Sequence, residues 1–134
     1  MIDRYTSKEM GSIWTLENEF RTMLKVEITA CEAMNKMGQV PDDALHDIQT
    51  KADFRLERIH EIEAVTNHDI IAFLTNVAEY VGPASKYIHK GLTSSDVKDT
   101  AMGIMMAQSA DILLDLLEKF HAVLTRRAAE FKHT

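Results

Sequence analysis

The chain has 134 residues, of which 46% are hydrophobic and 27% are charged, and its formal net charge is −6. It is long enough for one domain with a hydrophobic core, and its composition excludes a disordered protein. With 15 Lys and Arg against 21 Asp and Glu and no basic run, we expect no nucleic-acid binding. No apolar run approaches the roughly 20 residues that cross a bilayer, and no signal-peptide core is visible. We therefore expect a cytoplasmic protein with no membrane association.

Apolar residues recur at spacings of three and four along the chain, and this pattern predicts an all-α fold. The single cysteine, Cys31, is expected to be a small buried apolar residue. The first four predicted helices are a short one after residues 6–7, a longer one over 15–38 that Gly38 ends, a third opened by Pro41, and a fourth over 54–64.

The fifth helix is expected to begin in the stretch VTNHD, with Asn67 as its cap, and to end at Gly82 and Pro83. The last helix is predicted from Thr93 to about Lys132, because no proline or convincing stop signal follows.

The last helix is longer than the domain that carries it. About 38 residues at 1.5 Å rise are on the order of 57 Å, whereas a compact domain of this size is about 35 Å across. We therefore expect the helix to protrude and to pack against other subunits or another part of a longer chain. The predicted boundary near Leu92 divides an N-terminal helical domain (1–92) from the first long helix of a central bundle (93–134).

Polar residues gather at four places where a helix begins or the chain turns: Arg4-Tyr5, Asn67-His68-Asp69, His89 and Thr93-Ser94-Ser95. The last group offers more hydroxyls than one helix cap requires. A helix N-terminus with spare hydroxyls can bind a carboxylate or phosphate. The alternative is a capping box, in which Thr93 caps the helix and Asp96 reaches back.

The other three groups also have two interpretations each. His68 can donate a hydrogen bond or carry a proton, or it can be structural. His89, beside two lysines, can add positive charge toward an anion, or it can belong to a solvated surface cluster. Arg4 and Tyr5 offer donors suited to phosphate, or they form an ordinary surface pair. The remaining histidines show no metal-ligand spacing, so no metal site is expected.

Three stretches together resemble a known family: MIDRY at the start, VTNHDIIAF in the middle and HKGLTSSDVKDTA before the long helix. They are similar to the N-terminal part of the bacterial adenylosuccinate lyases, in the fumarase and aspartase superfamily, over essentially the whole chain. The resemblance implies a C–N lyase of purine biosynthesis that removes fumarate by anti β-elimination. Its substrates would be adenylosuccinate, giving AMP, and SAICAR, giving AICAR. It also implies no cofactor, and a homotetramer whose sites combine residues from three subunits.

The same resemblance implies roles for single residues. The nucleotide phosphate would be held by Arg4 and Tyr5, the substrate pocket lined by Asn67, His68 and Asp69, and the succinyl carboxylate received by Thr93 and Ser94, with His89 in support.

Two family features are missing from these residues. The family's general-acid histidine lies in a GRTH stretch and its catalytic serine in a flexible loop, and neither occurs here. We therefore expect one part of a larger enzyme that is inactive alone, with His68 in a supporting catalytic role. Asn67 stands where some members carry Arg, and Lys98 replaces a commoner apolar residue, which we interpret as a surface change. The competing interpretation is a non-catalytic helical interaction module in which TSSD only caps the last helix.

Overall fold

The computed structural model describes residues 2–134, and this part of the chain contains helices and no strands. The predicted all-α fold is confirmed. In chain order the elements are the 3₁₀ helix η1 (Asp3–Tyr5), α1 (Lys8–Ile13), α2 (Leu16–Lys36), α3 (Asp42–Lys51), α4 (Leu56–Thr66), α5 (Asp69–Val81), the 3₁₀ helix η2 (Gly82–Tyr87) and α6 (Ser94–Glu130).

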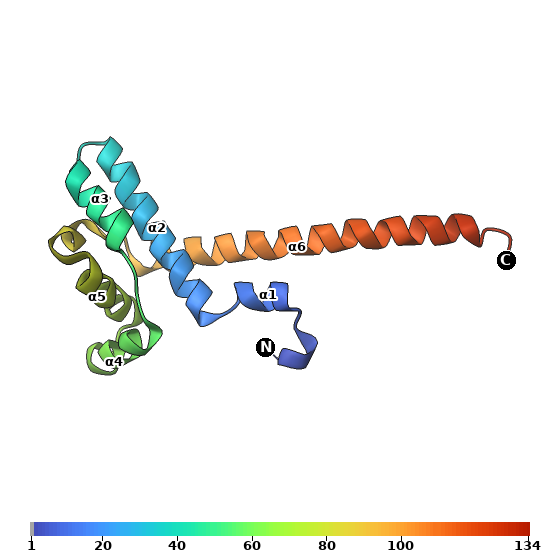
Figure 1. The fold of residues 1–134 in the computed structure, drawn as a ribbon, viewed down its shortest axis with the longest axis horizontal. Coiled ribbons are helices and arrows are strands. Elements are labelled where there is room, and N and C mark those ends of the chain that lie inside the picture. Colours follow the sequence, from blue (N-terminus) through green and yellow to red (C-terminus); the bar gives the residue numbers. More distant parts are fainter. Residues whose placement is uncertain (1) are drawn as a thin grey trace.

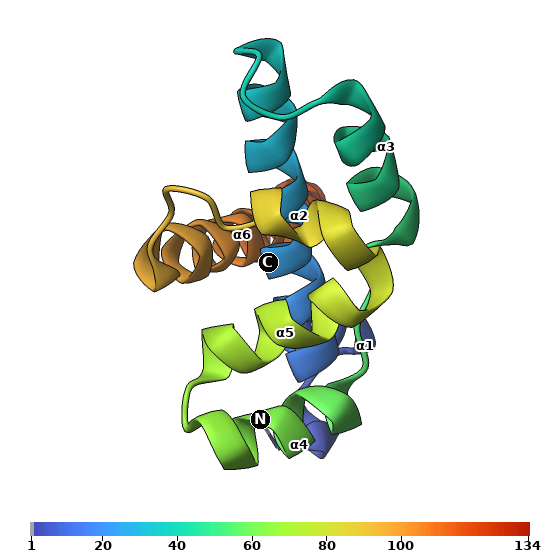
Figure 2. The same ribbon diagram turned by 90° about the vertical axis from the view of Figure 1, so that its left-hand side faces the viewer.

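The molecule has a helical body at one end and a single long helix that leaves it. Helices α2 to α5 form the body, and α6 starts there and extends away to the C-terminus (Figure 1). Figure 2 shows the molecule in a view along α6. In this view the helices α3, α5 and α4 lie in this order from one end of α2 to the other. Helix α4 packs against α5, while α6 crosses α2 and also contacts α1.

Most helix ends have the residues that the sequence predicted. The Ser7 hydroxyl accepts a hydrogen bond from the N–H of Met10 at 3.2 Å at the start of α1, and Thr15 accepts one from Asn18 at 3.1 Å at the start of α2. Beyond the end of α2, Gly38 has a φ of 73°, a conformation that glycine adopts without steric cost.

The predicted cap of α5 is wrong by one residue. Asn67 ends α4 instead, with a φ of 52°, and its N–H donates to the carbonyl of Glu63 at 2.8 Å. Asparagine tolerates this left-handed conformation better than most side chains, which explains its use here. The cap of α5 is His68, whose Nδ1 accepts the N–H of Ile71 at 3.3 Å.

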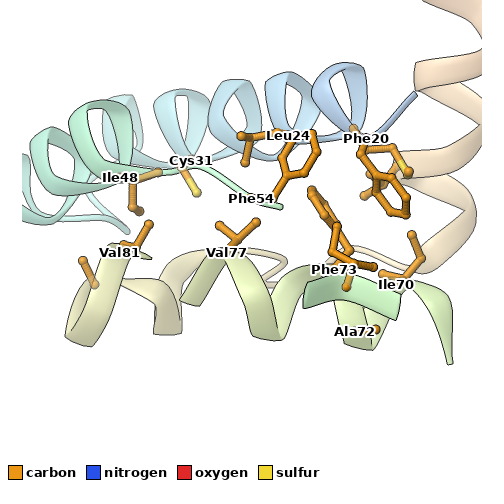
Figure 3. Packing of buried hydrophobic residues seen from close by; sticks show 14 of the residues in the cluster. Phe20, Leu24, Cys31, Ile48, Phe54, Ile70, Ala72, Phe73, Val77 and Val81 are labelled. Atoms are coloured by element: carbon orange, nitrogen blue, oxygen red, sulfur yellow. The ribbon is translucent and has the colours of Figure 1, made fainter. Parts of the chain in front are cut away.

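The core of the body is an aromatic cluster between α2 and α5. Phe20 of α2, Phe54 of the α3–α4 connection and Phe73 of α5 are all buried, and their rings point toward one another (Figure 3). The ring centroids lie 5.3 to 6.0 Å apart, which is the range of favourable aromatic pairs. Cys31 is fully buried elsewhere in the same hydrophobic core, as predicted. Because Phe54 packs into this core from the connection, α4 begins at Leu56, later than predicted.

Helix α6 is embedded only along its first part. Its buried residues are Val97, Ala101, Met105 and Ser109, all within its first half. Its 37 residues span on the order of 56 Å, so the predicted protrusion is confirmed. Several large apolar side chains beyond this point are exposed: Leu113, Leu114, Leu116, Leu117, Phe120, Val123 and Leu124.

By length and composition alone, α6 could also cross a membrane. It contains an 18-residue stretch with a mean hydropathy of 1.3 and 11% of its residues buried. The sequence-based expectation that no segment is apolar enough therefore fails for α6. One such helix is weak evidence for a span, and residues 100–117 include the acidic side chains of Asp111 and Asp115. Since carboxylates are costly within a bilayer, the composition favours packing against other helices.

Candidate functional site

The first half of the candidate site lies where α4 ends and α5 begins. Asn67 and His68 are exposed on the surface, and Asp69 is partly exposed. The Nδ1 of His68 faces the backbone of its own helix, where it accepts the Ile71 N–H, and lies 3.5 Å from an Asp69 carboxylate oxygen. The other ring nitrogen, Nε2, is therefore the one free for a ligand.

Asp69 joins this segment to the start of α6. Its Oδ1 accepts the N–H of Ile70 at 2.7 Å, and its Oδ2 accepts a hydrogen bond from the Lys98 ammonium at 2.5 Å. The hydrogen bond to Lys98 lowers the pKa of Asp69, and the same bond raises the pKa of Lys98. Lys98 is exposed, as the interpretation of a surface change requires, and its side chain also links two of the predicted site segments.

The second half of the site is the N-terminus of α6. Thr93 caps the helix: its hydroxyl accepts the N–H of Asp96 at 3.4 Å, and the Asp96 carboxylate accepts the Thr93 N–H at 2.7 Å. The hydrogen bond from the Thr93 N–H, and a second one from the Thr93 hydroxyl at 2.9 Å, lower the pKa of the Asp96 carboxyl group. The capping-box alternative is therefore realised, and it occupies the Thr93 hydroxyl.

Two hydroxyls remain beside this capping box. Ser94 is partly buried and Ser95 is exposed, and within residues 2–134 neither side chain makes a hydrogen bond. Both residues lie in the first turn of α6, where backbone N–H groups are free and the helix dipole is positive. An anion such as a carboxylate could be held here by the hydroxyls and the N–H groups together.

His89 lies four residues before the cap of α6 and contacts a buried acid. Its backbone N–H donates to Oε2 of Glu27 at 2.9 Å, and its Nδ1 lies 2.6 Å from Oε1. Glu27 is on α2 and is 1% exposed, so its carboxylate is shielded from water. The expected cluster of His89 with two lysines omitted this contact, and Glu27 was not among the predicted site residues.

The predicted phosphate pair lies apart from the other segments. Arg4 and Tyr5 belong to η1, and the Arg4 guanidinium stacks on the Tyr5 ring at 4.7 Å from its centroid. Figure 1 shows η1 beyond α1, away from the starts of α5 and α6. Both side chains are exposed, so they are free to meet a ligand or another chain.

The ion pair of Asp69 with Lys98 joins the segment of Asn67, His68 and Asp69 to the start of α6, on an open surface. His68 and Lys98 each expose almost half of their side-chain area, at 49% and 43%. The segment could orient an anionic ligand through one free ring nitrogen, two hydroxyls and a helix N-terminus. Among residues 2–134 no group of three or more metal-ligating side chains lies together.

Lys98 and Glu27 are the residues that sequence reasoning missed. The spacing from Asp69 to Lys98 carries no local pattern, because the ion pair depends on how α5 and α6 pack. Glu27 offered a weak signal: it falls one turn before Cys31, on the apolar face of its helix, where an acidic residue requires a partner.

Comparison with known proteins places this geometry among lyases. A family described as "Lyase" matches residues 3–134. The adenylosuccinate lyase of Synechocystis sp. is 49% identical over 134 residues, and those of Bacillus subtilis and Aquifex aeolicus are each 45% identical. Each match covers the whole of this chain, which spans about 31% of the length of each relative. The resemblance seen in the three sequence stretches is confirmed.

The fold also has a counterpart among solved structures. The crystal structure of a fumarate lyase from Mesorhizobium sp. aligns with a TM-score of 0.67 and 21% identity. The alignment covers 77% of this chain and 25% of that one. At this identity the likeness concerns the fold alone.

Proposed function

The chain belongs to the lyase family, and from this premise we propose that it forms the N-terminal part of an adenylosuccinate lyase. Such an enzyme eliminates fumarate from adenylosuccinate, giving AMP, and from SAICAR, giving AICAR, by breaking a C–N bond. The observation that carries the proposal is the 42–49% identity of the whole chain with adenylosuccinate lyases. The reaction runs without a cofactor, in the cytoplasm.

In this proposal the start of α6 receives the succinyl carboxylate. The Ser94 hydroxyl and the free N–H groups of the first turn supply the donors, while Thr93 shapes the turn through its capping box. His68 presents Nε2 to the substrate, because Nδ1 is bound to its own helix. Asn67 and Asp69 border the same pocket. The ion pair of Asp69 with Lys98 supports this grouping, since it holds α5 against α6.

His89, four residues before Thr93, has a supporting role. The nucleotide phosphate is bound by Arg4 and Tyr5, which lie further from the start of α6. Because η1 lies away from the start of α6, the complete site combines this surface with segments of other subunits. The exposed apolar face of α6 supports a homotetramer built around a central bundle, with residues 1–92 as a separate helical domain and 93–134 as the first bundle helix.

A hybrid enzyme tests the proposal. In it, this chain replaces the matching third of the Synechocystis adenylosuccinate lyase, and fumarate release from adenylosuccinate is measured. We expect activity in the hybrid and none from the chain alone. Substituting His68→Ala should lower kcat by about 10²-fold or more, the usual effect of losing a proton-transferring or orienting group. Substituting Ser94→Ala should weaken substrate binding by about tenfold, the value of one hydrogen bond to a charged group.

The matched control is Ser95→Ala, which removes the more exposed hydroxyl of the same turn; the proposal gives this hydroxyl no substrate contact, so activity should stay within about twofold. An assembled hybrid that releases no fumarate would contradict the proposed reaction. Full activity in both the His68 and the Ser94 variants would contradict the assigned site.

The second candidate, a helical interaction module, is favoured by one observation, the row of exposed leucines on α6. It predicts that the chain assembles with unchanged affinity after the His68 and Ser94 substitutions, and that it binds no AMP. Analytical ultracentrifugation and equilibrium dialysis with AMP, both on the hybrid, separate the two functions.

A further inference from the structure

Helix α2 carries a buried acidic residue, Glu27, that has no role in the proposed function. Glu27 is 1% exposed, and both of its carboxylate oxygens contact His89. Burying a carboxylate is costly unless it is hydrogen-bonded, and here His89 supplies the hydrogen bonds. We propose that Glu27 is a positioning residue that fixes the ring of His89 with Nδ1 inward and Nε2 toward the ligand.

Glu27 first affects the backbone of the segment before α6. His89 has a φ of 61°, a left-handed conformation that is unfavourable for most side chains, and Gly91 nearby has a φ of 77°. The Leu92 N–H donates to the His89 carbonyl at 3.3 Å and closes the turn. The Glu27 carboxylate accepts the His89 N–H in this conformation. Glu27 thus stabilises the turn that leads into α6.

A second side chain of α2, that of Cys31, binds the backbone of the segment that contains His89. Cys31 lies one helical turn after Glu27, and its thiol donates to the carbonyl of Tyr87 at 3.6 Å. Burial raises the pKa of this thiol to about 11, so it remains a neutral donor. Glu27 and Cys31, which lie on successive turns of α2, therefore both bind residues 87–89. The position of His89 is thus determined by its contacts with α2.

Glu27 also contacts the imidazole ring of His89. An ionised carboxylate can only accept hydrogen bonds, so beside an ionised Glu27 the imidazole atom 2.6 Å from it, Nδ1, carries a proton. The other ring nitrogen is then the only one available to a ligand. The His89 side chain retains 21% exposure, and it precedes the capping residue Thr93 by four positions. Glu27 therefore determines both the place of Nε2 and its hydrogen-bonding character.

The substitution Glu27→Gln changes this character with little change in shape. The glutamine oxygen is required by the His89 N–H, so the amide nitrogen faces Nδ1 and can only donate to it. The proton of the neutral ring must then move to Nε2. A role limited to packing would leave the ring proton where it was, because glutamate and glutamine have nearly the same volume.

Long-range ¹H–¹⁵N NMR of the histidine rings in the full chain reads the proton position directly, with His89→Gln assigning the signal. We expect Nδ1 to be protonated in the native chain and Nε2 alone to be protonated after Glu27→Gln. The control Glu32→Gln alters another acid of α2, which accepts from the Gln49 amide at 2.7 Å, and should leave the His89 signals unchanged. An unprotonated Nδ1 in the native chain overturns the proposal, even if no variant folds.

The link to a ligand rests on the proposed function and is tested in the hybrid enzyme. There, Glu27→Gln should lower kcat/KM by at least about tenfold, as is usual when a partner orienting a histidine is lost, and Glu32→Gln should not. Full activity of a Glu27→Gln hybrid whose ring proton has moved overturns the positioning role. An inactive native hybrid refutes the proposed function instead, and the NMR result then still decides the orientation of His89.

Discussion

Replacing Phe73 by alanine should remove a large part of the stability of the helical body. The Phe73 ring is fully buried, and its centroid lies 5.3 Å from that of Phe20 and 6.0 Å from that of Phe54. Burying such a side chain contributes about 1.5–3 kcal/mol, and each aromatic pair adds about 0.5–1.5 kcal/mol. These contributions add up to about 2.5–6 kcal/mol, and we expect a loss of about 3–5 kcal/mol, the usual cost of Phe→Ala in a core, which lies within that range.

The measurement is urea unfolding followed by far-ultraviolet circular dichroism. For a slope of about 1.5 kcal/mol per molar urea, the midpoint should fall by roughly 2–3 M. The matched control is Ile71→Ala on the same helix: Ile71 is 47% exposed, so its loss should change the free energy of unfolding by about 0.5 kcal/mol or less. A cost below about 1 kcal/mol for Phe73→Ala, or an equal cost for the control, would refute the assigned core.

Two further predictions concern the surface around α6. Thr93→Ala breaks the capping box and should lower the free energy of unfolding, measured in urea, by about 1 kcal/mol. Ser95→Ala, two residues later in the first turn, should be nearly neutral. Equal costs for the two substitutions would show that the cap is misassigned. The half-exposed pair of Asp69 and Lys98 should show a coupling of about 0.2–1 kcal/mol in a double-mutant cycle with Asp69→Asn and Lys98→Met. Because the pair lowers the pKa of Asp69, this coupling should be present at neutral pH and disappear as the pH falls through the lowered value, below 3.8. A coupling that persists below that value would contradict the ion pair.

The helices were predictable because their signals are local. Ser7 and Thr15 are caps by residue type, and Gly38 ends α2 because it alone tolerates a positive φ without a side-chain clash. The protrusion of α6 was predictable from its length, and its apolar faces were predictable from the spacing of its apolar residues. At α5 the local signal misled, since both Asn67 and His68 can end or begin a helix, and the sequence does not show which of them adopts the left-handed conformation.

The candidate site was only partly predictable, because its contacts join distant positions. The family resemblance indicated His68, His89 and Ser94, but neither Lys98 nor Glu27. The distance of 62 positions between Glu27 and His89, and of 29 between Asp69 and Lys98, is closed only by the packing of α2, α5 and α6. Such pairs depend on the tertiary fold, and the spacing of the residues along the chain does not predict them.

A partner that covered the exposed leucines of α6 would make the stability of this protein depend on the concentration of that partner. A partner that covers its leucines binds the folded helix and not the unfolded chain, so it adds about 2.7 kcal/mol to the free energy of unfolding at a hundred times its dissociation constant. Where that partner is another copy, the melting temperature rises with the amount of protein in the sample. A single value of the free energy of unfolding would then hold only for one protein concentration, and every contact made along α6 would stabilise the folded body together with its long helix.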